Sequence, residues 1–485
     1  MKKAATFVVL LAILVGVGSV NLMTAVPYIV IATVVAITVL VALDKVNERY
    51  YPVYIYGLAL VLLWQTSMLS SYVVGADIHG ELFAANKAIV GGWDFGWTYV
   101  NNTSLVLGGI TPLIAKLGID PLWQFKALYP AIFALVPVIL YYAYKKMMNE
   151  KKAYFAALFF MTVPVFFVEI VGIVKSMVAE VFLALMILFM VSSLKDWQRA
   201  LGIGVTAILA AVCHYTVGIL TIIYLVGSFV VLLIGIKWLR GRRIALAYYG
   251  VAIVVILTSS YLWFSIVGDG DMLKYVERIG RMEVAAINYH LSTNTNASDI
   301  NEATIVPEPK TPKAVTPKSE TPKEPPPKAP PPKTSSPKSV TSETSLPKSA
   351  IPKSDISEPS LPKSKSYLHK QEPLIRVALG LDLVGAPIEG KAFRILQYLT
   401  QFLIVAGFIY LMLRRRSYSF TPEFVACIVP CFGLLGMCLF FPAFSSLINA
   451  SRFYHTSLFF LAPLLVVGAE QLVNDFSRLC GRVRG

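Results

Sequence analysis

Charged residues are scarce in this sequence. Asp, Glu, Lys and Arg make up only 15% of the 485 residues, whereas 56% are hydrophobic. A soluble globular domain carries about 25% charged residues, so this deficit excludes an ordinary soluble enzyme. The apolar residues gather into runs of about 20, long enough to span a bilayer as helices. A membrane barrel would need short alternating strands instead, so the sequence predicts an all-α polytopic membrane protein.

Cysteine and acidic residues are also few. The five cysteines mostly lie within apolar runs and have no metal-ligand spacing, so we interpret them as small buried hydrophobic residues. The 28 acidic residues against 43 basic ones give a formal net charge of +15. In a soluble protein this charge would suggest a nucleic-acid partner. Here the basic residues lie mainly at the ends of the apolar runs. The topology of a membrane protein therefore explains the positive charge, and we expect no nucleic-acid partner.

The apolar runs predict about 12 transmembrane helices. The first run follows Lys2 and Lys3, and we interpret it as an uncleaved anchor because a second run follows at once. The predicted spans are Ala5–Met23, Val26–Leu43, Val53–Tyr72, Ala127–Tyr144, Ala153–Ile170, Ile173–Val191, Ala200–Cys213, Thr216–Ile236, Ala245–Ile266, Phe393–Leu413, Phe424–Phe441 and Tyr454–Val473.

Basic residues are distributed unevenly between successive loops. If the N-terminus is cytoplasmic, the inner segments hold clusters such as Lys145–Lys146 and Arg414–Arg416, while the short outer turns hold only Lys175 and Arg452. Cytoplasmic loops are enriched in Lys and Arg. The sequence therefore predicts a multi-pass protein of the cell membrane with both termini cytoplasmic and its active face outside.

Two long outer loops divide the chain. The predicted parts are N-terminal transmembrane helices over 1–72, a first outer loop over 73–126, a transmembrane core over 127–266, a second outer loop over 267–392, and C-terminal helices with a basic cytoplasmic tail over 393–485.

The second outer loop contains a Pro/Lys tract over 306–365. Lysine recurs there every five residues, for example from Lys313 to Lys338. Such a tract cannot bury apolar surface, so we predict a solvated, disordered segment with polyproline II character. A spacer is the default interpretation. The alternatives are an arm that binds an anionic cell-surface polymer and a scaffold for O-glycans.

Ionisable residues gather on the predicted outer face. The first outer loop begins with Asp77, His79 and Glu81, which are the candidate catalytic residues. Carboxylates four residues apart share one face of a helix, and either could act as a general base or hold a divalent metal. The alternative for this motif is a solvated loop start with incidental charges.

Cations on the same face are candidate ligands for a phosphate. Lys175 and Arg452 are the two residues concerned, and Arg can bind a phosphate through two parallel hydrogen bonds. The alternatives are an ion pair of Lys175 with Glu169 or Glu180, and an Arg452 that only reaches for the membrane surface. The candidate supporting residues are Glu169, Glu180, His214, Tyr215 and His455.

Together these residues suit a reaction at an anionic lipid headgroup. A carboxylate would activate a hydroxyl, while Lys and Arg neutralise a departing phosphate. The stretch from Asp77-Ile78-His79-Gly80-Glu81 through Ile110-Thr111-Pro112-Leu113 to the span at 129–144 resembles the GT-C superfamily of membrane glycosyltransferases. The turn at 214–216 and the helix entry at 452–454 are similar to features of archaeal polytopic membrane proteins grouped with these enzymes.

The resemblance covers about 53–266 and 393–473 and implies a GT-C-like fold. It implies a sugar donor linked to polyprenyl phosphate or pyrophosphate, used at the outer membrane face. It also implies that Asp77 is the catalytic base or a metal-binding acid, with Asp77 and Glu81 as candidate ligands for Mg²⁺ or Mn²⁺. No cofactor is certain from the sequence, and the expected partners are the lipid-linked donor and the bilayer.

Two other functions are compatible with a polytopic chain. A transporter or lipid flippase would place ionisable residues near mid-membrane, break its helices at Gly or Pro, and contain an internal repeat. A non-catalytic cell-envelope anchor would present the Pro/Lys tract and would not require the cluster of outer acids and bases.

Overall fold

The computed structural model describes residues 26–235, 243–267, 388–413, 419–440 and 450–483, with isolated positions between 270 and 281. The chain divides into one unit of Met1–Asn288 with Gln371–Gly485 and a second unit of Tyr289–Lys370. The Pro/Lys tract and the predicted span Ala5–Met23 lie outside the described residues. All helices named below belong to the first unit.

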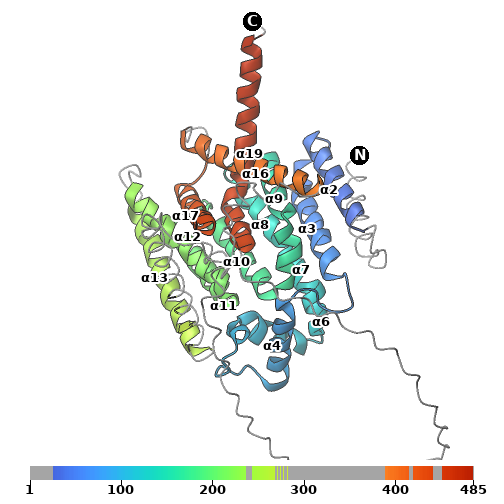
Figure 1. Ribbon diagram of the computed structural model, residues 1–485. Helices are drawn as coiled ribbons and strands as arrows, with labels where there is room; N and C mark the ends of the chain where they lie inside the picture. Colours follow the sequence, from blue (N-terminus) through green and yellow to red (C-terminus); the bar gives the residue numbers. More distant parts are fainter. Residues whose placement is uncertain are drawn as a thin grey trace, which may run out of the picture. The chain divides into compact units, whose positions relative to one another are not determined.

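Every regular element in the described residues is helical, which confirms the all-α class (Figure 1). The helices of the first half are α2 (Val26–Ala42), α3 (Tyr51–Ser67), α4 (Asp77–Gly91), α5 (Thr111–Lys116), α6 (Pro121–Trp123), α7 (Tyr129–Phe133), α8 (Leu135–Lys145), α9 (Glu150–Thr162), α10 (Val174–Met190), α11 (Asp196–Cys213), α12 (Tyr215–Ile234) and α13 (Arg243–Ile266). Those of the second half are α16 (Ile388–Leu413), α17 (Pro422–Phe440) and α19 (Ala450–Val483). Between them lie 3-10 turns at η2 (Glu48–Tyr50), η3 (Val100–Thr103) and η7 (Ile170–Gly172), and π-helical turns at η4 (Val106–Ile110), η5 (Gln124–Leu128) and η6 (Val165–Glu169).

Six of the described helices are long and apolar enough to cross a membrane. They are Pro121–Lys145, Tyr215–Ile234, Leu246–Ile266, Arg394–Leu413, Pro422–Leu439 and Ala450–Ser477. Three other predicted spans form the helices α2, α3 and α10, of 17 residues each. A helix of 17 residues is about 26 Å long, slightly less than the roughly 30 Å hydrocarbon core. The described residues therefore support a multi-span membrane protein with fewer clear spans than the 12 predicted.

One further span is broken. The helices Glu150–Thr162 and Val165–Gly172 pass the test for a span together but are bent by 55°. The break falls at Val163, which is extended with ψ 132°. The next residue is Pro164, and the proline ring disfavours a helical conformation in the residue before it. Counting this pair as one span raises the number to seven.

Helix α10 is at the centre of the unit. Helices α7, α8, α11, α12 and α17 all contact it, and Figure 1 shows it surrounded by these helices. Most of its side chains are buried, including the ionisable residues Lys175 and Glu180. A helix that is surrounded in this way can bring polar groups from several other helices together.

Helix α19 is held against α16 by a close backbone contact. A Cβ atom on Gly407 would lie 1.9 Å from the carbonyl oxygen of Leu464, and one on Gly468 would lie 2.0 Å from that of Leu403. Only glycine permits such an approach, as at other packed membrane helices. This contact fixes the position of α19, which carries Arg452 and His455.

The predicted first outer loop is largely helical. Its main element, α4, lies at one end of α10 and packs beside α5 and α6 (Figure 1). Gly75, just before α4, has φ +131°, and a Cβ there would lie 2.9 Å from the Cα of Gly172, just before α10. This conformation and this contact both require glycine. The starts of α4 and α10 are therefore brought together by backbone contact.

Candidate functional site

Asp77 forms an ion pair with Arg452 at the α4 end of the bundle. The Arg452 Nη2 donates a hydrogen bond of 2.9 Å to the Asp77 Oδ2, which joins positions 375 residues apart. Asp77 is the first residue of α4, where a carboxylate interacts favourably with the helix dipole. Its side chain remains 51% exposed. This carboxylate is therefore open to a second reactant.

Glu81, one turn further along α4, has a different environment. Its side chain is fully buried, and Oε2 accepts the backbone N–H groups of Val174 at 2.7 Å and Lys175 at 3.4 Å. These are the first residues of α10, whose own preceding residue, Ile173, provides no side-chain cap. The first N–H groups of a helix lack partners inside the helix. Glu81 therefore caps α10 from another helix, and this position does not favour the catalytic role predicted for it.

Lys175 neutralises Glu81 in this buried position. Its Nζ lies 3.5 Å from Glu81 Oε1 and also donates to the side-chain oxygen of Asn101. Burial raises the pKa of the Glu81 carboxyl above its ordinary value, and the Lys175 charge and the backbone N–H groups of α10 oppose that rise. The sequence suggested Glu169 or Glu180 as an alternative ion-pair partner of Lys175. The structure pairs Lys175 with Glu81 on α4 instead.

The polar cluster at this end of the bundle comprises Asp77, Glu81, Asn101, Lys175, Glu180, His214, Tyr215, Arg452 and His455. Sequence reasoning missed Asn101. Its side-chain oxygen accepts from Lys175, and its amide nitrogen donates to the hydroxyl of Tyr99 at 3.2 Å. Asn101 begins a run of four polar residues, Asn101–Ser104, directly after the aromatic segment, and nothing in that run distinguishes it from its neighbours. Its side chain links the aromatic segment to the Lys175 ammonium.

His214 and Tyr215 lie at the junction of α11 and α12. His214 is extended, with φ −150° and ψ 115°, and so separates the two helices. Burial, together with the Lys175 and Arg452 charges, holds the pKa of the His214 imidazole well below its ordinary range. This imidazole is therefore neutral at neutral pH. The Tyr215 ring lies 5.7 Å from Lys175 Nζ, within the range of a cation–π contact.

A second buried layer joins α10 to α19. The Oε2 of Glu180 lies 3.0 Å from the Nε2 of His455, and Ser176 donates to the other Glu180 oxygen at 3.2 Å. His455 follows Arg452 by three residues, which places both on one side of α19. This pair therefore lies about one turn deeper than the Arg452 guanidinium.

The remaining predicted residues fall into two groups. Glu169, at the end of η6, accepts a 2.6 Å hydrogen bond from the hydroxyl of Ser451 on α19, so it borders the cluster. His79 is exposed on α4. No hydrogen bond or ion pair joins it to the other described members, so the geometry does not favour its predicted catalytic role.

Several buried polar atoms of the cluster have no hydrogen-bond partner among the described residues. They are the Nε of Arg452, the Nδ1 of His214, the Nδ1 of His455 and the Oε1 of Glu81, the last of which keeps its ion pair with Lys175. Buried polar groups in proteins are nearly always paired with protein or water. Such a concentration of unpartnered atoms indicates a place for water or a polar ligand.

The two predicted metal ligands do not suit a divalent ion. Asp77 faces Arg452, whereas Glu81 faces Lys175 and two backbone N–H groups, so the carboxylates turn to different cations. Within the described part of the chain, no group of three His, Cys, Asp or Glu side chains could hold a metal ion. The donor set does not fit Mg²⁺ or Mn²⁺.

Comparison with known proteins gives a match to one family model over the C-terminal helices. A family model described as a predicted membrane protein (DUF2206) matches residues 386–484, about a fifth of the chain. The matched segment contains α16, α17 and α19, including Arg452 and His455. No curated protein and no solved structure matches the chain. The family match and the six apolar helices together indicate that this is a membrane protein.

Proposed function

We propose that this protein is a membrane glycosyltransferase that moves a sugar from a polyprenyl-phosphate or polyprenyl-pyrophosphate donor to an acceptor at the outer membrane face. The single observation that carries the proposal is the exposed Asp77 carboxylate paired with Arg452, whose Nε has no partner among the described residues. A base and a phosphate-binding cation thus lie side by side. The GT-C-like fold, the 12 spans and the sidedness of the membrane belong to the same proposal.

The reaction follows from the positions of these two groups. Asp77 accepts the proton of an acceptor hydroxyl, and the hydroxyl oxygen forms a bond to the anomeric carbon of the donor sugar. The bond between that carbon and the phosphate oxygen breaks, and its electron pair leaves with the phosphate. Attack from the side opposite the leaving group inverts the anomeric centre. General-base assistance of this kind contributes about 10²–10⁴-fold to a rate.

Arg452 has the geometry to stabilise the leaving group. A guanidinium offers five donors, so Arg452 can hold Asp77 through Nη2 and bind a phosphate through the N–H groups of its other terminal nitrogen, Nη1. Lys175, which like Arg452 acts electrostatically on His214, adds a second positive charge to the site, although Glu81 offsets part of that charge. The neutral His214 provides a ring nitrogen for a hydrogen bond without adding charge.

The test is sugar transfer from radiolabelled polyprenyl-phosphate sugars in proteoliposomes. Asp77→Asn preserves shape and removes the base, so transfer is expected to fall about 10²–10⁴-fold. The matched control is Asp94→Asn, another exposed carboxylate of the same segment, whose side chain accepts only a local hydrogen bond from the Gly96 N–H. The control is expected to retain native transfer.

Two results would overturn the assignment. The first is native transfer by Asp77→Asn, which would remove the base from the mechanism. The second is an absence of transfer from every donor and acceptor in the panel by a native chain that is folded in the membrane. Either result would leave the ion pair with a structural role.

A transporter or lipid flippase is the second candidate, because two observations favour it. Glu180 and His455 form a fully buried pair within the helices, and ionisable groups at such depth often mark a transport path. The span at Val163 is also broken by 55°, as in many transporters. Movement of a fluorescent polyprenyl phosphate across the bilayer, lost in Glu180→Gln, would support this candidate. The envelope-anchor alternative depends on a tract outside the described residues.

A further inference from the structure

A second polar site lies further along α19, away from the Asp77–Arg452 site near the start of this helix. Glu470 follows Arg452 by 18 residues, which is about 27 Å along a helix that rises 1.5 Å per residue. This separation is close to the roughly 30 Å thickness of the hydrocarbon core. The two sites therefore lie near opposite faces of the membrane.

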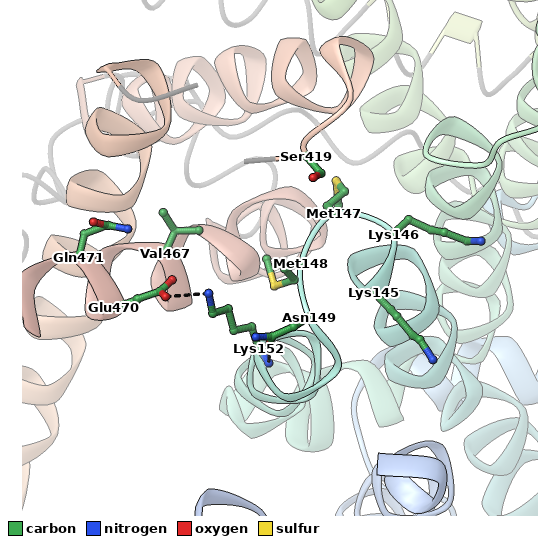
Figure 2. A pocket seen from close by; sticks show the side chains of 10 residues that line it. All are labelled: Lys145, Lys146, Met147, Met148, Asn149, Lys152, Ser419, Val467, Glu470 and Gln471. Atoms are coloured by element: carbon green, nitrogen blue, oxygen red, sulfur yellow. Dashed lines mark hydrogen bonds and ion pairs between the residues drawn. The ribbon is translucent and has the colours of Figure 1, made fainter. Parts of the chain in front are cut away.

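The second site contains a cavity of about 470 Å³ (Figure 2). The turn between α8 and α9 forms one wall, and α19 forms the other. The lining residues are Lys145, Lys146, Met147, Met148, Asn149, Lys152, Ser419, Val467, Glu470 and Gln471. Three lysines and one glutamate line the cavity; Lys145 pairs with Glu150 and Lys152 with Glu470, so Lys146 keeps an uncompensated positive charge among the described residues. The cavity therefore favours an anionic ligand.

The lysines differ in how they are placed. Figure 2 shows Lys152 pointing across the cavity to Glu470, with 2.7 Å between its Nζ and the Glu470 Oε1. Lys145 and Lys146 extend away from the cavity. Lys145 pairs with Glu150, and Lys146 is exposed with no ion pair among the described residues. Lys152 is therefore the cation for direct contact, and Lys146 contributes positive potential at the rim.

Apolar side chains adjoin these charges. Met147, Met148 and Val467 line the same cavity. Methionine is flexible and adapts to irregular apolar ligands. Basic pockets between membrane helices near the membrane surface suit lipid headgroups, whose acyl chains remain in the bilayer. This combination of charge, apolar lining and depth fits a phospholipid better than a freely soluble anion.

We propose that this cavity binds the phosphate headgroup of an anionic phospholipid. The lipid phosphate takes the place of the Glu470 carboxylate as the partner of Lys152. The side-chain oxygen of Asn149 caps α9, and its amide nitrogen supplies a donor for the glycerol part of the headgroup. This site is separate from the Asp77–Arg452 site and does not depend on the proposed transferase activity.

The test titrates the full chain in detergent with phosphatidylglycerol and phosphatidylcholine and counts bound lipids by native mass spectrometry. Each lysine near a membrane surface is worth about a fivefold change in affinity for an anionic lipid. Phosphatidylglycerol should therefore bind at least about fivefold more tightly than phosphatidylcholine. Lys152→Gln should remove most of this preference, whereas Glu470→Gln should raise phosphatidylglycerol affinity because it frees Lys152.

The matched control is Lys151→Gln. Lys151 is the sequence neighbour of Lys152, pairs with Asp44 at 2.8 Å and does not line the cavity. Its replacement should leave the preference for phosphatidylglycerol within about twofold of native, because its ammonium is held by Asp44 outside the cavity lining. Lys146→Gln provides a second variant that breaks no ion pair, with an expected loss of about fivefold.

Three results would overturn the proposal. Equal binding of the two lipids by the native chain would show no preference for the anionic headgroup. Equal losses in Lys151→Gln and Lys152→Gln would show a general effect of charge. Complete displacement of phosphatidylglycerol by inorganic phosphate would identify a soluble anion as the ligand. If Lys152→Gln does not fold, Lys146→Gln and Glu470→Gln still give the opposite changes that the proposal requires.

Discussion

Two ion pairs one turn apart on α4 have different environments. Asp77 and Arg452 meet at the surface, whereas Glu81 and Lys175 meet in the interior, where Glu81 is fully buried. An exposed pair contributes little to stability, and a buried pair is costly when one partner is lost. The same pairing of acid and base thus leaves one carboxylate available for chemistry and commits the other to holding α4 against α10.

The largest expected effect comes from breaking the buried pair on one side. Lys175→Met leaves the Glu81 carboxylate buried without its cation, which should reduce the free energy of unfolding by about 3–5 kcal/mol. Denaturant unfolding in detergent measures this loss. The double variant Glu81→Gln/Lys175→Met should recover most of it, since no uncompensated charge remains. An equally unstable double variant would contradict the interpretation.

The pH dependence of Lys175→Met sharpens this comparison. The pKa of Glu81 is already raised by burial in the native protein, and removal of Lys175 takes away a charge that opposes the rise. A carboxyl with a raised pKa in the folded state stabilises the fold below its unfolded pKa of about 4.3, and that contribution is lost as pH rises through the folded pKa. The defect of Lys175→Met should therefore be smallest in acid and increase towards neutral pH. The double variant should lack this dependence.

A smaller effect is expected where the two helices touch. Gly75→Val places a side chain 2.9 Å from the Cα of Gly172, at a backbone φ of +131°. Strain of this kind costs about 1–3 kcal/mol, and it should also separate Glu81 from the start of α10. Thermal unfolding in detergent measures the loss. Gly91→Ala is the control, because a Cβ there meets no atom within 4 Å and should not destabilise the protein.

The smallest effect on stability is expected at the exposed pair. Asp77→Asn should change the free energy of unfolding by only about 0–1 kcal/mol, because water solvates both partners. The same denaturant series measures it. A loss as large as that of Lys175→Met would mean that Asp77 is also needed for stability. A fall in transfer by Asp77→Asn could then result from unfolding and would not identify Asp77 as the base.

The sequence predicted more of the site's membership than of its contacts. The alternation of basic loops predicts Lys175, Arg452 and His214 on one membrane face. The structure pairs Lys175 with Glu81 and Arg452 with Asp77, and both cations act on His214. The pairing could not be predicted, because a carboxylate at the start of one helix can reach any cation on the same face. Only the close contact of the segments before α4 and α10 selects Lys175 as the partner of Glu81.

The fold was predicted at a similar level. The helical class followed directly from the apolar runs, but the 17-residue lengths of α2, α3 and α10 were not visible in a pattern whose ends are uncertain by about 2–4 residues. The helices within 73–126 were also missed. They have 15, 6 and 3 residues in α4, α5 and α6, too short for a search that looks for apolar runs of about 20 residues.

The cap on α10 also bears on how the chain is assembled. Glu81 is synthesised almost 100 residues before the helix that it completes, so its carboxylate is already present when the first N–H groups of α10 leave water. A membrane helix cannot leave such groups unsatisfied at low cost. Damage at Glu81 would therefore reduce the amount of protein that reaches the membrane. A mutational screen that scores only activity would class Glu81 with Asp77, whereas the quantity of inserted protein would separate a residue needed for biogenesis from one needed for turnover.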